Sequence, residues 1–181
     1  MLINQYQTLA QRTSLDDGHD KLDNGILGLI GETGEIVDLY KKWKYQSTPG
    51  TLLPMERMLE ELGDALWYAA ELAAGRQRML SEIVGTFVDL DTVGRMATPK
   101  KRDMRKLIVS LSMNASDICE HAHKKRFEQM DKALKNMMVG MAILSSVCGS
   151  SLDAVAAMNI EKLKKRYPHG FDPKISMGRY E

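Results

Sequence analysis

Apolar side chains recur at helical spacing along most of this chain. Near the N-terminus, Leu2, Tyr6 and Leu9 follow the i, i+4, i+7 spacing of one helical face. The same kind of pattern predicts helices over residues 2–12, 22–44, 54–74, 79–90, 100–125, 127–147 and 151–166. Pro54 and the Thr98-Pro99 pair stand where helices are expected to begin. We therefore expect an all-α protein built as an antiparallel helical bundle.

Two pairs of carboxylates lie beside the apolar faces of the second and third predicted helices. Glu32 and Glu35 form one pair, and Glu61 and Asp64 form the other. Side chains at i and i+3 share a helical face, so each pair points one way. If the two helices pack as an antiparallel pair, the four acids converge in a partly buried place, where they must take up protons or bind cations. Oxygen ligands favour Mg²⁺, with Mn²⁺ as a substitute.

Glycine recurs every third residue in the first of these two helices, at Gly25, Gly28, Gly31 and Gly34. A glycine inside a helix costs roughly 1 kcal/mol relative to alanine, so four of them need a physical reason. Close packing of a neighbouring helix would supply one, and close approach of a ligand would supply another. Both interpretations stay open at this point.

The sequence around the acids, G-x-x-GE-x-GE followed by ELGDxLWY, closely resembles that of the all-α nucleoside triphosphate pyrophosphohydrolases. That group includes the MazG-type enzymes and the dimeric dUTPases, and the match looks nearest the short MazG-like proteins. The C-terminal NIEKLKKRYPHGF, residues 159–171, is similar to the segment that ends the family's domain. The resemblance implies a single all-α domain over residues 1–181, with a catalytic half over residues 1–90.

This resemblance implies Mg²⁺-dependent hydrolysis of a nucleoside triphosphate to the monophosphate and pyrophosphate. Its metal ligands would be Glu32, Glu35, Glu61 and Asp64. Glu35, with Glu32 beside it, would be the catalytic group that helps to deprotonate the attacking water. Asn159, Lys162, Arg166 and Tyr167 match the family's C-terminal segment and are the expected substrate-binding residues there. Lys42 and Trp43, at the end of the first acidic helix, are two further candidates for contact with phosphate and base, although a lysine there also suits the helix dipole and Trp43 could simply cap the core. Two alternatives stay open: a dUTPase of the dimeric type, and a helical protein that binds nucleotides or another protein without turnover.

The second half of the chain reads as a degenerate copy of the first. Residues 29–42 align with 111–124, and residues 56–84 align with 128–156. The acids are mostly lost in this copy, because Asn114, Asp117, Ala133 and Asn136 stand where the first half has its four carboxylates. We therefore expect a pseudo-dimer whose second half, residues 98–171, contributes the family's C-terminal tail but binds no metal.

Composition limits the possible partners and the cellular location of the protein. The chain has 181 residues and a formal net charge of +1, which favours no nucleic-acid partner, and no apolar run approaches the roughly 20 residues that span a bilayer. The two cysteines predict no disulfide framework and, with a polar N-terminus, indicate a cytoplasmic protein. A methionine cluster at residues 130–141 is typical of core filling, although it could also be an adaptable surface. We expect either a homodimer or a monomeric pseudo-dimer.

Overall fold

Seven helices make up the part of the chain that the structure describes. This computed structural model describes residues 1–15, 20–85, 90 and 103–172. The helices are α1 (Ile3–Gln11), α2 (Lys21–Gln46), α3 (Met55–Gly75), α4 (Leu80–Val84), α6 (Met104–His123), α7 (Phe127–Val147) and α8 (Leu152–Arg166). Within these residues there is no strand, so the expected all-α fold is confirmed.

Side-chain caps explain where three of the helices begin. Asp20 accepts hydrogen bonds from the backbone N–H groups of Leu22 and Asp23, at 3.0 Å each, and starts α2. Asp103 and Ser151 do the same for α6 and α8. The predicted helix start at Thr98-Pro99 lies outside the described residues. The expected helix over 79–90 is wrong in its length, because α4 ends at Val84, where Gly85 takes a φ of +77° that ends the helix.

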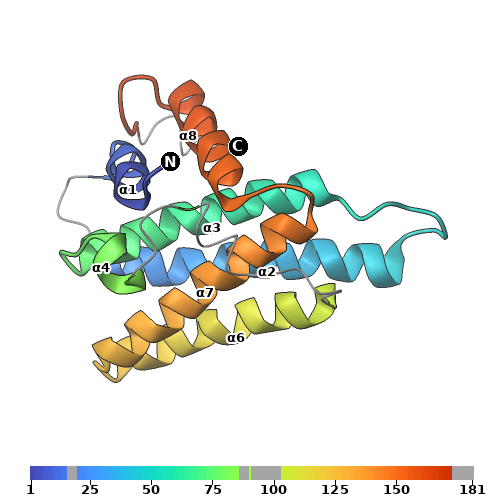
Figure 1. Ribbon diagram of the computed structural model, residues 1–181, viewed down its shortest axis with the longest axis horizontal. Coiled ribbons are helices and arrows are strands. Elements are labelled where there is room, and N and C mark those ends of the chain that lie inside the picture. The colour runs from blue at the N-terminus through green and yellow to red at the C-terminus, as the bar shows by residue number, and fades with distance from the viewer. Residues whose placement is uncertain (16–19, 86–89, 91–102, 173–181) are drawn as a thin grey trace.

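The centre of the molecule is a bundle of four long helices, α2, α3, α6 and α7 (Figure 1). The α2 and α3 helices run antiparallel and form one hairpin, while α6 and α7 form a second, and α2 also packs along α6. Buried leucines and methionines fill the space between them. All four methionines of the 130–141 cluster are at most 1% exposed, so the core-filling interpretation is confirmed and these side chains form no adaptable surface.

Two further helices cover one side of α3. The chain turns by 94° between α7 and α8, and Gly149, with φ of +77°, allows this turn. As Figure 1 shows, α8 then rises steeply from the bundle over α3, with α1 beside it. This turn is what places the C-terminal segment near the acids of α3.

A buried carboxylate joins α1 to the bundle. Glu71 of α3 is fully buried and accepts hydrogen bonds from Gln11 at 2.8 Å, Ser14 at 3.0 Å and Asn24 at 3.3 Å. These donors offset the cost of burying the carboxylate. These hydrogen bonds also hold the end of α1 and the start of α2 against α3.

Among the described helices, none alone is long and apolar enough to cross a membrane. The bent pair of α7 and α8 passes the test of length and composition only when the two are taken together.

Candidate active site

Three of the four predicted acids meet between α2 and α3. Carboxylate oxygens of Glu32, Glu61 and Asp64 all lie within 4.8 Å of one another, and each side chain is partly buried. Glu32 comes from α2, and the other two come from successive turns of α3. The antiparallel hairpin predicted from the sequence therefore brings these carboxylates together.

Two glycines allow α2 and α3 to approach closely enough for this. A Cβ atom on Gly25 would lie 2.6 Å from the backbone nitrogen of Leu72, and one on Gly28 would lie 2.1 Å from Cδ1 of Tyr68. Alanine at position 25 would therefore collide with the backbone of α3, and alanine at position 28 would collide with the ring of Tyr68. Gly31 and Gly34 differ, because the space around them is open. Close packing thus explains the first half of the glycine stripe and not the second.

Glu35 lies at the edge of the cluster. It is exposed and does not belong to the group of three, but its charge raises the pKa of both Glu32 and Glu61. Glu35 is therefore near enough to act on the same ligand, from the solvent side.

The carboxylates of the cluster are partly buried and repel one another. Burial, followed by the charges of Asp64 and Glu61, raises the pKa of Glu32 to about 7. Burial and the charges of Asp64 and Glu35 also raise the pKa of Glu61. A bound cation would stabilise the ionised form of these carboxyl groups. Converging, partly buried oxygen donors fit a hard divalent cation such as Mg²⁺ or Mn²⁺.

The α8 helix brings two of the predicted substrate-binding residues to the cluster. Nδ2 of Asn159 donates to Oδ1 of Asp64 at 3.0 Å, and Nζ of Lys162 donates to the same oxygen. Lys162 lowers the pKa of both Glu32 and Glu61 and so partly compensates their charge. A groove of about 370 Å³ opens beside these contacts, between α3 and α8. Its lining includes Asn159, Lys162 and Lys165.

The other predicted substrate-binding residues lie farther from the acids. Lys42 pairs with Asp38 at 2.6 Å, and the indole N–H of Trp43 donates to the carbonyl oxygen of Thr51 at 2.8 Å. From Glu32 to Lys42 the axis of α2 covers about 15 Å at 1.5 Å per residue. For these two residues, a contact with the substrate stays a prediction.

Arg166 and Tyr167 end α8. Arg166 is partly buried, and the Tyr167 ring is 7% exposed, with its centroid 5.2 Å from that of Phe171. Tyr167 also lines a small cavity between α1 and α8, beside Leu9 and Arg12. Their roles toward the substrate stay predictions.

Sequence reasoning missed Tyr6, which contacts the site from α1. Its hydroxyl donates to Oδ1 of Asn159 at 2.9 Å, and the side chain is fully buried. In the sequence, Tyr6 is only one member of an amphipathic pattern. Nothing in that pattern shows that its hydroxyl faces a polar partner.

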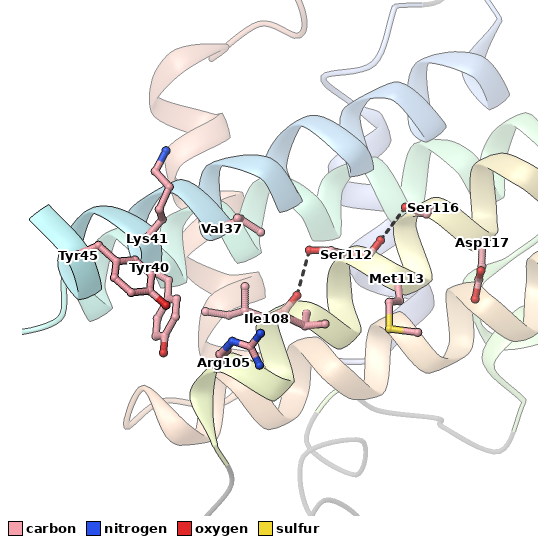
Figure 2. Close-up of a pocket in the computed structure, with 11 residues that line it drawn as sticks. Val37, Tyr40, Lys41, Tyr45, Arg105, Ile108, Ser112, Met113, Ser116 and Asp117 are labelled. Carbon is pink, nitrogen blue, oxygen red and sulfur yellow. Dashed lines mark hydrogen bonds between the residues drawn. The ribbon is translucent and has the colours of Figure 1, made fainter.

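A separate groove follows the contact between α2 and α6. Figure 2 shows one end of it, which is lined by Tyr40 and Tyr45 of α2 and by Arg105 and Ile108 of α6. This part has a volume of about 450 Å³, and the groove continues along Ile30 and Gly34. None of the four predicted acids lines it, so the groove is distinct from the acidic cluster.

A helical bundle that presents E-x-x-E and E-x-x-D acids to one another defines an all-α nucleoside triphosphate pyrophosphohydrolase. Within that superfamily, a family model described as dUTPase matches residues 2–167, so the chain belongs to this all-α dUTPase family. Searches of curated proteins and of solved structures gave no significant match.

This membership refines the expectation from the sequence. The chain is a hydrolase that acts on phosphoanhydride bonds, and the family uses a divalent metal. The matching family is that of the dUTPases, so the alternative of a dimeric-type dUTPase is better supported than a broad MazG-like activity.

Proposed function

We propose that this protein hydrolyses dUTP to dUMP and pyrophosphate at the cluster formed by Glu32, Glu61 and Asp64, with Glu35 at its edge. The observation that carries the proposal is the meeting of these acids with Asn159 and Lys162 of α8, in a chain of the dUTPase family. Carboxylates alone repel a triphosphate, whereas a mixed set of acids, an amide and an ammonium can hold both a metal and phosphate oxygens.

The acids are the expected ligands of Mg²⁺, which Mn²⁺ can replace. A divalent ion held there would neutralise phosphate charge and lower the pKa of the attacking water. The remaining steps belong to side chains of this chain. Glu35, exposed at the edge of the cluster, is the proposed acceptor of the water's proton. A new bond forms between the water oxygen and the α-phosphorus. The bond between the α-phosphorus and the oxygen that bridges it to the β-phosphorus breaks, and pyrophosphate leaves.

Lys162 and Arg166 are proposed to stabilise the leaving pyrophosphate. Lys162 already lies among the acids, and Arg166 follows it by one helical turn on α8. An ammonium and a guanidinium on one helical face suit the charge that develops as pyrophosphate leaves. Asn159, one turn earlier, would complete a polar face of α8 that is directed at the nucleotide.

The test is a substrate panel with product analysis. The purified protein is incubated with dUTP, dUDP, dCTP, dTTP, dGTP and dATP, with Mg²⁺ and with EDTA, and nucleotide products and pyrophosphate are measured. Mg²⁺-dependent dUMP and pyrophosphate, with dUTP strongly preferred, support the proposal. Comparable turnover of several nucleotides would replace it with a broad pyrophosphohydrolase. Near-normal dUTP turnover by Glu35→Gln would refute the role given to Glu35.

We also propose that the chain arose by duplication of a helical hairpin. Positions that the sequence alignment pairs share the same burial: Ile36 with Ile118, Met58 with Met130, Leu62 with Leu134, Leu72 with Leu144 and Leu80 with Leu152 are all at most 1% exposed. Each pair lies on corresponding helices of the two halves. Shared burial at matched positions is what a degenerate copy retains when its acids are lost.

A homodimer is our proposal for the assembly. Several apolar side chains are exposed along α2 and α6: Leu27, Ile30, Val37, Val109 and Met113. Four of them, Ile30, Val37, Val109 and Met113, line the groove between α2 and α6, and grouped exposed apolar side chains of this kind often mark a protein interface. Light scattering of the wild type and of a Val109→Lys, Met113→Lys double variant would show whether this face holds two copies together. A monomeric wild type would favour the single-chain pseudo-dimer.

A further inference from the structure

A chain of two buried hydrogen bonds leads from α1 to the acidic cluster. Tyr6 donates from its hydroxyl to Oδ1 of Asn159 at 2.9 Å, and Asn159 donates from Nδ2 to Oδ1 of Asp64 at 3.0 Å. Tyr6 is fully buried and Asn159 is 3% exposed. Water is therefore largely excluded from Tyr6 and Asn159. The Tyr6 hydroxyl and the Asn159 amide oxygen depend on each other as hydrogen-bond partners.

The hydrogen bond from Tyr6 sets the orientation of the Asn159 amide. Rotated by half a turn, the amide would turn its oxygen toward the Asp64 carboxylate, and two acceptors would face each other. The Tyr6 hydroxyl occupies the amide oxygen, so that the NH₂ group remains on the side of Asp64. Burial and the charge of Asp64 raise the pKa of Tyr6 well above its usual value, and the phenol therefore keeps the proton that it donates.

The backbone of α3 restricts the same amide from the opposite side. A Cβ atom on Gly63 would lie 3.1 Å from Cβ of Asn159 and 3.4 Å from its Nδ2. Because residue 63 has no side chain, α8 comes close enough for Asn159 to reach Asp64, one residue farther along α3. Asn159 is thus held between Gly63 and Tyr6.

We propose that Tyr6 is a positioning residue of the active site, which acts through Asn159 to orient Asp64 for metal binding. This inference rests on the proposed function in one respect, that Asp64 is a metal ligand. It extends the site to α1, a helix that contributes none of the acids. Loss of a partner that orients a metal ligand typically costs 10- to 100-fold in metal affinity.

The test measures Mn²⁺ binding by electron paramagnetic resonance without nucleotide, in wild type, Tyr6→Phe, Asn159→Ala and the double variant. Ser145→Ala is the matched control, because it removes another fully buried hydroxyl whose donor bond, at 2.9 Å, stays within α7. We expect Tyr6→Phe to weaken Mn²⁺ binding about 10-fold and Ser145→Ala to leave it unchanged. In the Asn159→Ala background, Tyr6→Phe should have no further effect.

A second readout follows the Asn159 amide itself. Its side-chain NH₂ signals in a nitrogen-15 NMR spectrum, identified by their loss in Asn159→Ala, should exchange slowly with water in wild type and faster in Tyr6→Phe. Wild-type Mn²⁺ affinity in Tyr6→Phe would overturn the proposal. The proposal would also be overturned if Tyr6→Phe weakened Mn²⁺ binding by the same factor in the Asn159→Ala background. A urea unfolding midpoint of Tyr6→Phe well below that of Ser145→Ala would overturn it too, because the effect would then be one of general stability.

The outcomes separate this inference from the proposed function. If the wild type binds Mn²⁺ but hydrolyses no nucleotide, the dUTPase proposal fails while the Tyr6 assignment is still decided by Mn²⁺ binding. If the wild type binds no Mn²⁺, the positioning role is overturned together with the metal site.

Discussion

Lys162 and Asp64, 98 residues apart in the sequence, are bonded through Nζ and Oδ1 in the folded chain. This contact joins the family's C-terminal segment on α8 to the E-x-x-D pair on α3. The same cation lowers the pKa of Glu32 on α2 and of Glu61 on α3. One ammonium therefore influences the ionisation of carboxylates on both helices of the acidic hairpin.

We expect Lys162→Met to lower kcat/KM for dUTP by about 10²-fold or more, in the range seen when one group that stabilises transition-state charge is removed. It should also raise the pKa of Glu32 further, so that Mn²⁺ binding requires a higher pH. Activity assays and Mn²⁺ titrations at several pH values measure both effects. Lys162→Arg, which keeps the charge, is the matched control and should lose less. Wild-type kcat/KM in Lys162→Met would contradict the assignment.

Glu32 makes the stability of the metal-free protein depend on pH. Its pKa is about 7 in the folded state, against an ordinary value of 4.5, so the folded state binds more protons than the unfolded state between these values. The free energy of unfolding therefore falls as pH rises from about 4.5 to about 7 and is level above. Partial exposure reduces the size of the effect to about 1–3 kcal/mol.

Glu32→Gln should remove this pH dependence. With EDTA present, the variant should be more stable than wild type at pH 8 and similar to it at pH 4, while its dUTP hydrolysis is lost. Urea unfolding at the two pH values measures the difference. Asp117→Asn, an exposed acid on α6, is the control and should change stability by less than about 0.5 kcal/mol at either pH. Parallel pH curves for wild type and Glu32→Gln would count against the raised pKa.

Metal binding should depend on pH for the same reason. Because a ligand carboxyl must be ionised, Mn²⁺ affinity should rise about 10-fold per pH unit below pH 7 and level off above it. Calorimetric titration at pH 6, 7 and 8 checks this. EDTA should abolish turnover, and added Mg²⁺ or Mn²⁺ should restore it. Full activity in EDTA would rule out the metal-dependent mechanism.

The sequence predicted the long helices well because each carries a strong local pattern, whereas the expected 79–90 helix already ends at Val84. Expected bounds of 127–147 for α7 agree with Phe127–Val147, and those of α2 differ by at most two residues from Lys21–Gln46. The acid pairs were also predictable, since spacing of i and i+3 fixes a shared face whatever the tertiary packing. Asn159 and Lys162 could be placed only through the family resemblance, because α8 reaches α3 by a turn that no periodicity encodes.

What the sequence could not predict depends on contacts between distant segments. Tyr6 reads as an ordinary core residue until α8 supplies Asn159 as its partner. Glu35 shares a helical face with Glu32 yet stays outside the group of three, because one turn farther along α2 the side chain is exposed. The glycine stripe looked uniform, but α3 covers only Gly25 and Gly28.

The glycines of α2 allow the two explanations for the stripe to be separated. Gly25→Ala should destabilise the protein by about 1–3 kcal/mol, because its Cβ would meet the backbone of Leu72. Gly31→Ala and Gly34→Ala should each stabilise it by up to about 1 kcal/mol, since both positions are open and alanine favours the helix. Urea unfolding of the three variants measures these changes.

Activity should then distinguish Gly31 from Gly34. Gly31 lies one turn before Glu35 on the same face, at the edge of the acids, whereas Gly34 lines the groove between α2 and α6. If the open glycine beside the acids serves the close approach of a nucleotide, Gly31→Ala lowers kcat/KM for dUTP although it stabilises the fold. Gly34→Ala, the matched control, keeps wild-type kcat/KM. Equal activity in both variants would show that the nucleotide does not approach this face of α2, and the contacts with substrate would then have to come from α3 and α8.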